Sequence, residues 1–153
     1  MTAAAEFNIY YDAEAARTVL RSPATKTLVP LDVSRRVILT FEHFNRFPAE
    51  GTSPAAAFLR RLLPYSFRAH HQYLGIEGIA LREVVALAAV ARPALFRTEP
   101  MAVDVETRGE LSRGSTIFDR RGIPRWQTNI DVASEVDQQG VLDYVTEILK
   151  FAG

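Results

Sequence analysis

The sequence predicts an α/β fold within one domain that covers residues 1–153. Short β-branched or aromatic runs alternate with stretches whose apolar residues recur at helical spacing, which is typical of this class. Prolines and glycines fall between these runs and mark turns. A chain of 153 residues that is 48% hydrophobic is long enough to bury one core.

The first thirty-odd residues predict a strand, a helix and a second strand. Residues 7–11 are β-prone, and Asp12 offers a side-chain acceptor for the free amides of a helix over 13–21. Ser22-Pro23 ends that helix, and residues 27–33 again read as a strand. A helical connection between strands is what a parallel sheet requires.

The middle of the chain predicts helices. Apolar residues at helical spacing indicate an amphipathic helix over 34–47. A second helix begins near Ser53 and ends or kinks at Pro64, and residues 65–73 continue as another. Residues 81–91 are alanine-rich and nearly all apolar, so we expect a helix buried on most sides.

The last third predicts three strands and a closing helix. Residues 101–106, 115–119 and 127–133 are β-prone or alternate. The turns around these strands are marked by Gly109, Gly114 and Gly122. One apolar face from about residue 137 to 151 predicts the final helix.

Charge and composition exclude several classes. With 18 basic and 18 acidic residues, no net field attracts nucleic acid or a membrane surface. No apolar run is long enough to cross a bilayer, and the first residues lack a signal-peptide pattern. The absence of cysteine removes disulfides and thiolate metal sites. We therefore expect an unprocessed, soluble, cytoplasmic protein.

Three ordered segments carry a resemblance to a known family. They are residues 5–16 (AEFNIYYDAEAA), residues 29–33 (VPLDV) and residues 103–116 (VDVETRGELSRGST), the last followed by 119–122 (DRRG). In order and spacing they resemble the C-terminal half of an inosine/uridine-preferring nucleoside hydrolase; Ala13 departs from the family's usual proline. The resemblance implies a partial nucleoside-hydrolase-like open sheet flanked by helices.

The resemblance implies that Glu6 and Asn8 hold the ribose hydroxyls. If residues 7–11 form a strand, a carboxylate and an amide two residues apart point the same way and can share a vicinal diol. The alternative is that both side chains only cap or satisfy the backbone at a strand end.

The resemblance also places a His-Asp pair at the start of the apolar helix, with the Asp binding calcium and the His near the leaving base. Here Arg82 and Glu83 occupy those places. Arg82 is permanently charged and cannot donate a proton to the base. Glu83 can still offer oxygen ligands to calcium as an altered metal ligand, but it is one methylene longer than Asp, so the metal or the backbone has to shift. The alternative is that the two residues form an ion pair with a neighbour at the helix start.

The resemblance places Tyr65, His70 and His71 on a helix that covers the base. Tyrosine and histidine can stack on a heterocycle and hydrogen-bond to it. Adjacent histidines do not share a helix face, which argues against a joint metal site, and the alternative is an aromatic helix that packs on a partner. We expect structural roles for four further residues: His43, Asp104, Glu106 and Asp119.

The family's N-terminal aspartate cluster, which holds calcium and activates water, has no counterpart in this sequence. We therefore assign no catalytic residue and expect the chain alone to bind no calcium and to be inactive or incomplete as a purine/pyrimidine N-ribohydrolase. The second hypothesis is a non-catalytic ligand-binding or assembly domain. In either case we expect a homo-oligomer or a partner that supplies the missing N-terminal half, since an incomplete sheet leaves an edge and an apolar face exposed.

Overall fold

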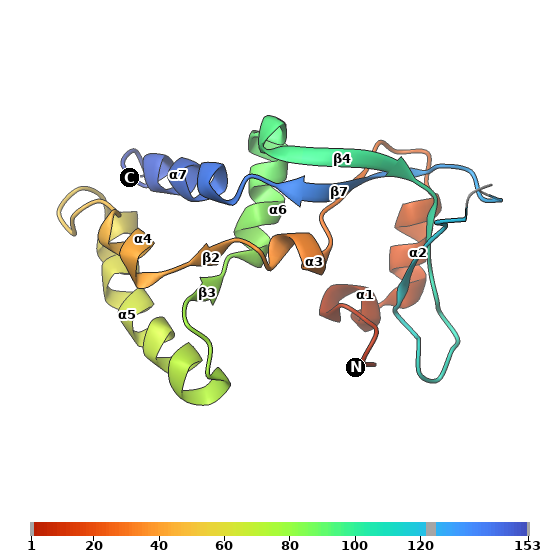
Figure 1. Cartoon of the computed structure of the whole chain (residues 1–153), viewed down its shortest axis with the longest axis horizontal. Coiled ribbons are helices and arrows are strands. Elements are labelled where there is room, and N and C mark those ends of the chain that lie inside the picture. The colour runs from red at the N-terminus through yellow and green to blue at the C-terminus, as the bar shows by residue number, and fades with distance from the viewer. Residues whose placement is uncertain (1, 122–124, 153) are drawn as a thin grey trace. The chain divides into compact units, whose positions relative to one another are not determined.

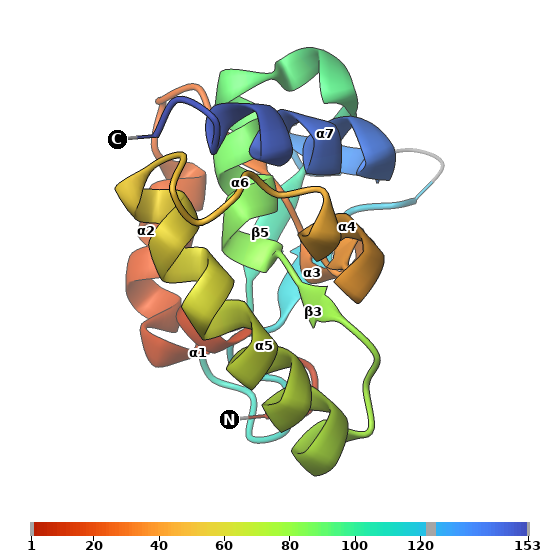
Figure 2. The ribbon, with the colours of Figure 1, turned by 90° about the vertical axis from the view of Figure 1, so that its left-hand side faces the viewer.

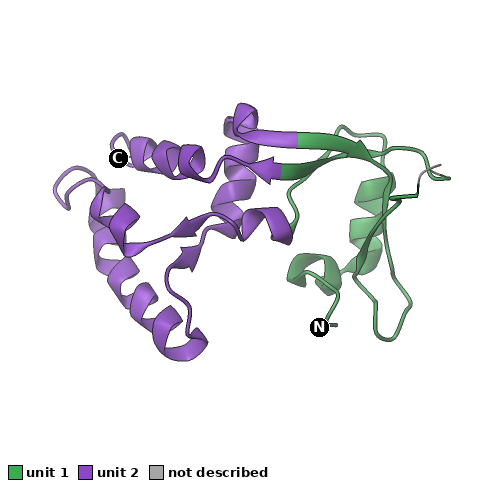
Figure 3. Cartoon of the chain, in the orientation of Figure 1, with its two compact units in different colours: residues 1–30, 98–134 green, residues 31–97, 135–153 purple. Residues whose placement is uncertain are grey.

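The computed structural model describes residues 2–121 and 125–152, and the chain forms two compact units (Figures 1 and 3). Unit 1 comprises residues 1–30 and 98–134, and unit 2 comprises residues 31–97 and 135–153. The turn expected at Gly122 lies outside the described residues.

The helices are α1 (Phe7–Tyr11), α2 (Ala13–Arg21), α3 (Leu31–Ser34), α4 (Phe41–Asn45), α5 (Pro54–Leu74), α6 (Arg82–Ala91), the 3-10 turn η1 (Pro93–Leu95) and α7 (Gln138–Ile148). The strands are β1 (Thr27–Leu28), β2 (Ile38–Leu39), β3 (Ile79–Ala80), β4 (Phe96–Met101), β5 (Val103–Val105), β6 (Thr116–Phe118) and β7 (Ile130–Val136). Most helices lie before β4, and the strands β4 to β7 follow one another before the last helix. The α/β prediction is confirmed, with small open sheets.

The strands form three small sheets among the described residues. One has the order β1-β7-β4, with β1 parallel to β7 and Thr27 opposite Asp131. Two antiparallel pairs follow: β2 with β3, and β5 with β6. The parallel neighbour of β1 is therefore a late strand, and the predicted opening unit of strand, helix and strand is wrong.

Residues 7–11 form the helix α1 instead of the predicted strand. The Glu6 carboxylate accepts hydrogen bonds from the backbone N–H groups of Asn8 and Ile9, at 2.8 and 3.1 Å. This cap satisfies two amides that a helix start otherwise leaves without partners, and it overrides the strand preference of the aromatic residues. The predicted helix over 13–21 is confirmed as α2, with Asp12 as its cap.

Residues 27–47 are more broken than predicted. The expected strand over 27–33 ends at Leu28, and α3 begins directly after Pro30. The expected helix over 34–47 is wrong, because its first half contains β2. Thr40 caps the separate helix α4 by accepting from the N–H of His43.

Pro64 lies inside one continuous helix, α5, rather than between two. Proline removes one backbone hydrogen bond, but Phe67 in the next turn packs edge-on against Phe41 and Phe44 of α4, at centroid distances of 5.8 and 5.9 Å. These contacts hold the second half of α5 in place. The helix ends at Gly75, whose φ of 62° gives the left-handed conformation common after a helix.

The C-terminal elements follow the prediction. β5, β6, β7 and α7 lie within or next to the expected ranges, and Asp137 caps α7 by accepting from the N–H of Gly140 at 2.9 Å. The helix α6 also forms as expected, but its burial was predicted wrongly. Val85 and Ala88 are buried, whereas Leu87 and Val90 are 69% and 80% exposed.

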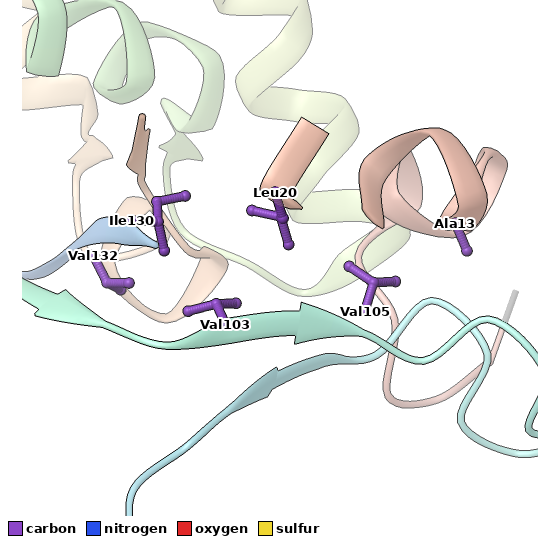
Figure 4. Close-up of a cluster of buried hydrophobic side chains, with 6 residues drawn as sticks. All are labelled: Ala13, Leu20, Val103, Val105, Ile130 and Val132. Carbon is purple, nitrogen blue, oxygen red and sulfur yellow. The ribbon is translucent and has the colours of Figure 1, made fainter. Parts of the chain in front are cut away.

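Each unit has its own apolar core. In unit 1, α2 packs against β5, and the core cluster consists of Ala13, Leu20, Val103, Val105, Ile130 and Val132 (Figure 4). In unit 2, the fully buried side chains include Leu39, Val85 and Val141, and Phe44 joins an aromatic cluster with its neighbours. No helix in the described part of the chain is both long and apolar enough to span a bilayer.

Candidate nucleoside site

The turn into α1 brings Glu6 and Asn8 together. The Asn8 side-chain amide donates to Glu6 Oε1 at 3.2 Å, and Glu6 Oε2 holds the two capping amides. Asn8 is exposed and Glu6 is half-buried. The expected capping role of Glu6 is present. It leaves room for a ligand, because Glu6 Oε1 accepts only from the Asn8 side chain and keeps a second lone pair, and the Asn8 amide oxygen faces no recorded donor among the described residues.

The loop before β6 packs against α1 and the residues that precede it. Gly114 has a φ of 81°, and a Cβ at this position would lie 2.9 Å from Tyr10 Cα and 3.0 Å from Ala5 Cβ. Only glycine allows the loop to approach α1 this closely. Arg113 donates to the Tyr10 carbonyl at 3.1 Å and to Glu14 at 3.0 Å. The loop thereby fixes the position of the Glu6–Asn8 turn within unit 1.

An ion-pair network joins α2 to β5 within unit 1. Asp104 accepts from Arg17 Nε at 2.9 Å, from Arg17 Nη2 at 2.8 Å and from Arg21 at 2.6 Å. Burial is the largest influence on the pKa of Asp104 and acts to raise it. The hydrogen bonds from both arginines and from the Val105 N–H outweigh it and lower the pKa to about 2. Asp104 therefore stays ionised and holds the fold together, as predicted.

Glu106 and Asp119 also organise the backbone. Glu106 accepts from the N–H groups of Arg108 and Gly109, which lowers its pKa. Asp119 has a side chain only 1% exposed and pairs with Arg121 at 2.6 Å, which, with backbone N–H donors, holds its pKa well below the usual range. Both carboxylates are committed to loop structure. His43, on α4, is similarly engaged, with Nδ1 2.8 Å from Thr40 Oγ1.

Unit 2 contains a cavity of about 420 Å³ along α5. Figure 2 shows α5 in front, with α4 and the segment leading into β3 to its right. The lining residues are Phe41, Pro64, Phe67, Arg68, His71, Gln72, Glu77 and Gly78. Phe41 and Phe67 give it aromatic walls, and Arg68, Gln72 and Glu77 provide donors and acceptors at its edge.

The four residues predicted for the base side have different places. His71 lines the cavity, and its Nδ1 lies 2.8 Å from Glu77 Oε1. His70 is turned into its own helix, with Nδ1 2.8 Å from the Ser66 carbonyl. Tyr65, on α5, is 65% exposed, and Arg82 is exposed at the first position of α6; neither lines the cavity.

Sequence reasoning missed most of the cavity. The lining positions 64, 67, 68, 71 and 72 have the spacing of one helix face. The sequence predicts this face only if residues 54–74 are taken as one helix. The assumed break at Pro64 hid the pattern. Phe41 comes from a separate segment and carried no signal of its own.

Glu83 was predicted as an altered calcium ligand, and it lies exposed in the first turn of α6. Calcium takes six to eight oxygen ligands. Across residues 2–121 and 125–152, no three His, Asp or Glu side chains gather to hold a metal ion. The described residues by themselves therefore do not fit a calcium site. Within the same residues, the recorded ion pairs also give no partner to Arg82 or Glu83, contrary to the alternative of a helix-start ion pair.

Over residues 1–143 the sequence matches the family described as inosine-uridine preferring nucleoside hydrolase. The chain belongs to this family.

Curated relatives agree with this assignment. The pyrimidine-specific ribonucleoside hydrolase RihA of Escherichia coli O9:H4 (strain HS) is 35% identical over 151 residues, which are 98% of this chain and 48% of the relative. The chain thus spans about half the length of the curated relatives it matches.

Solved structures show the same coverage. The chain is similar to a purine-preferring ribonucleoside hydrolase from Gardnerella vaginalis, with a TM-score of 0.80 and 27% identity over 97% of this chain and 48% of that one. It is also similar to a plant nucleoside hydrolase, with a TM-score of 0.80 and 26% identity over 96% and 48%.

Proposed function

We propose that this chain supplies the ribose- and base-contacting part of a ribonucleoside hydrolase, an enzyme that cleaves the N-glycosidic bond of nucleosides. The observation that carries the proposal is the Glu6–Asn8 pair, joined at 3.2 Å in an accessible turn of a chain from this family. Glu6 Oε1 can accept from one sugar hydroxyl, and the Asn8 amide oxygen can accept from the neighbouring hydroxyl. The ribose 2′- and 3′-hydroxyls have this arrangement.

The α5 cavity of unit 2 is proposed by itself, without reference to the position of the Glu6–Asn8 turn in unit 1, as a base subsite. Phe41 and Phe67 provide apolar faces for a flat heterocycle, and Gln72 and Arg68 provide hydrogen bonds to its edge. His71 belongs to this subsite. Tyr65, His70 and Arg82 are proposed as base-side residues near the subsite in sequence, on α5 and at the start of α6, but they do not line the cavity.

Hydrolysis needs more than these residues. A calcium ion bound in a site of this kind would lower the pKa of a water molecule and make it a nucleophile. Glu83 offers one carboxylate for such an ion, and the remaining ligands must come from outside the described residues. Arg82 is not assigned as a general acid, because a guanidinium is a poor proton donor. We therefore assign no catalytic residue and propose that the chain alone does not turn over nucleosides.

The test is saturation-transfer NMR of uridine and inosine with the purified chain. The proposal predicts saturation-transfer signals from the ribose and from the base. Asn8→Ala should lower the affinity measured from the ribose signals, and Phe67→Ala the affinity measured from the base signals, each by at least about tenfold, because each variant removes a direct contact. The matched control for Asn8→Ala is Gln139→Ala, which removes another exposed amide. The matched control for Phe67→Ala is Phe58→Ala, since Phe58 lies on α5, is 62% exposed and does not line the cavity. Equal binding by all four variants would contradict the proposed site.

A second candidate function is a non-catalytic assembly domain. Arg82 and Glu83 in place of the family's His-Asp pair favour it, as do large exposed apolar side chains on α5, including Phe58 and Tyr73. It predicts a homo-oligomer at micromolar concentration with no nucleoside signal. Sizing by analytical ultracentrifugation, run beside the NMR titration, separates the two functions.

A further inference from the structure

The turn after α5 brings a carboxylate back to the helix. Gly75, in the left-handed conformation, donates its N–H to the His71 carbonyl at 3.1 Å and reverses the chain. Gly78 is buried with a φ of 95°, and a Cβ there would lie 2.9 Å from the Leu39 carbonyl oxygen of β2. Only glycine lets the chain pass this close to β2. The two glycines therefore hold the short segment that carries Glu77.

Glu77 meets His71 at the mouth of the α5 cavity. Both residues line the cavity, and His71 Nδ1 lies 2.8 Å from Glu77 Oε1. An ionised carboxylate only accepts hydrogen bonds, so the histidine donates from Nδ1 and orients the carboxylate. Among the described residues this is the one hydrogen-bonding contact recorded for the Glu77 side chain. Oε2 and a second lone pair on Oε1 are therefore available to a ligand.

Arg68 places a positive charge in the same cavity. Phe67 and His71 form one row along α5, and Arg68 and Gln72 form the next, each pair four residues apart. The ion pairs recorded among the described residues give Arg68 no carboxylate partner. The cavity thus offers an acceptor group, Glu77, and a separate donor group, Arg68, beside an aromatic wall.

We propose that the α5 cavity selects guanine among the nucleobases and that Glu77 is the residue that determines this specificity. The two oxygens of one carboxylate are best matched by two neighbouring N–H groups, and guanine presents its N1–H beside its 2-amino group. The guanine O6, on the other side of N1, can accept from Arg68. The inference rests on the proposed function, because it names the base for the proposed subsite.

The other bases match this carboxylate less well. Adenine and cytosine set a ring nitrogen acceptor beside their amino group, so the second carboxylate oxygen would face a lone pair. Uracil has one N–H between two carbonyls, and hypoxanthine lacks the 2-amino group. Aromatic walls stack on any of these rings and do not choose among them. The E. coli relative is named as pyrimidine-specific, so the proposal gives this chain a different base.

The experiment compares guanosine with inosine, which differ only by the 2-amino group, by calorimetric titration of the purified chain. Contributions from the ribose cancel in the ratio of the two affinities. The expected result is that guanosine binds at least about fivefold more tightly than inosine, and more tightly than uridine and adenosine. Glu77→Gln should bring the guanosine-to-inosine ratio to about one, because its amide N–H would face the base N–H groups.

The matched control is Glu50→Gln. Glu50 also pairs with a side chain of α5, Arg61 at 2.7 Å, but it does not line the cavity, so the ratio should be unchanged. His71 is proposed as a positioning residue for Glu77. His71→Phe keeps a ring but removes the donor and should lower the ratio, whereas His71→Asn, whose amide nitrogen takes the place of Nδ1, should restore it.

Two results would overturn the inference alone and leave the proposed function standing: equal affinities for guanosine and inosine, or a guanosine preference that survives Glu77→Gln. Tighter binding of uridine than of guanosine would overturn it in the same way. If the chain binds no nucleoside, the proposed function fails together with the inference. Failure of the base preference and failure of the site are therefore distinguishable in one set of titrations.

Discussion

Replacing Asp104 by asparagine tests the ion-pair network that holds α2 on β5 in unit 1. The carboxyl pKa is lowered from 3.8 to about 2, which corresponds to about 2.5 kcal/mol of stability at neutral pH. Arg21 is 59% exposed, so solvent screens its attraction to Asp104. We therefore expect Asp104→Asn to lower the free energy of unfolding by about 1 to 2 kcal/mol. Because the pKa is lower in the folded state, this contribution is complete above about pH 4 and is lost as the pH falls toward 2.

The assay is urea unfolding followed by the fluorescence of Trp126, which is the chain's one tryptophan and lies in unit 1. Glu14→Gln is the control, since the Glu14–Arg113 pair spans 3.0 Å in the same unit but Glu14 is 64% exposed; its loss should change stability by less than about 0.5 kcal/mol. Equal stability of Asp104→Asn and the unaltered chain at pH 7 would refute the reasoning. So would a difference that persists undiminished near pH 2.

Three further substitutions test contacts within each of the two units. Gly114→Ala should lower the stability of unit 1 by about 1 to 3 kcal/mol in the same fluorescence assay, whereas Gly51→Ala, where a Cβ meets nothing within 4 Å, should be neutral by circular dichroism. Asp137→Ala should cost about 1 kcal/mol by loss of the α7 cap, measured by thermal unfolding against Glu147→Ala in the same helix. Phe44→Ala, which removes a ring only 5% exposed, should cost about 3 to 5 kcal/mol in urea unfolding; a cost no larger than that of Phe58→Ala would contradict the aromatic cluster.

The sequence predicts the end of the chain better than its beginning, for physical reasons. The late strands alternate clearly and Asp137 is a visible helix cap, so local pattern and tertiary structure agree there. Residues 7–11 have strand propensity, but the Glu6 carboxylate caps two amides and a helix forms. At residues 34–47, a helical spacing of apolar residues conceals a new helix start at Thr40.

The candidate site is predictable only in part. Glu6 and Asn8 are two residues apart in one matched segment, so the resemblance identifies both, and the helix start brings them into contact. The cavity joins Phe41 to Phe67 across 26 positions, and no local pattern connects the two segments. The exposed face of α6 also escapes sequence reasoning, because an apolar helix predicts burial and does not say which partner provides it.

A hydrolysis assay with uridine and inosine tests the central claim most directly. The purified chain is measured with and without calcium, and then together with the segment of the E. coli relative outside its match. The account predicts no release of base by the chain alone under either condition, because its described residues do not gather a calcium site. Calcium-dependent turnover by the chain alone would contradict it, and would mean that the nucleophile-activating group lies within these 153 residues.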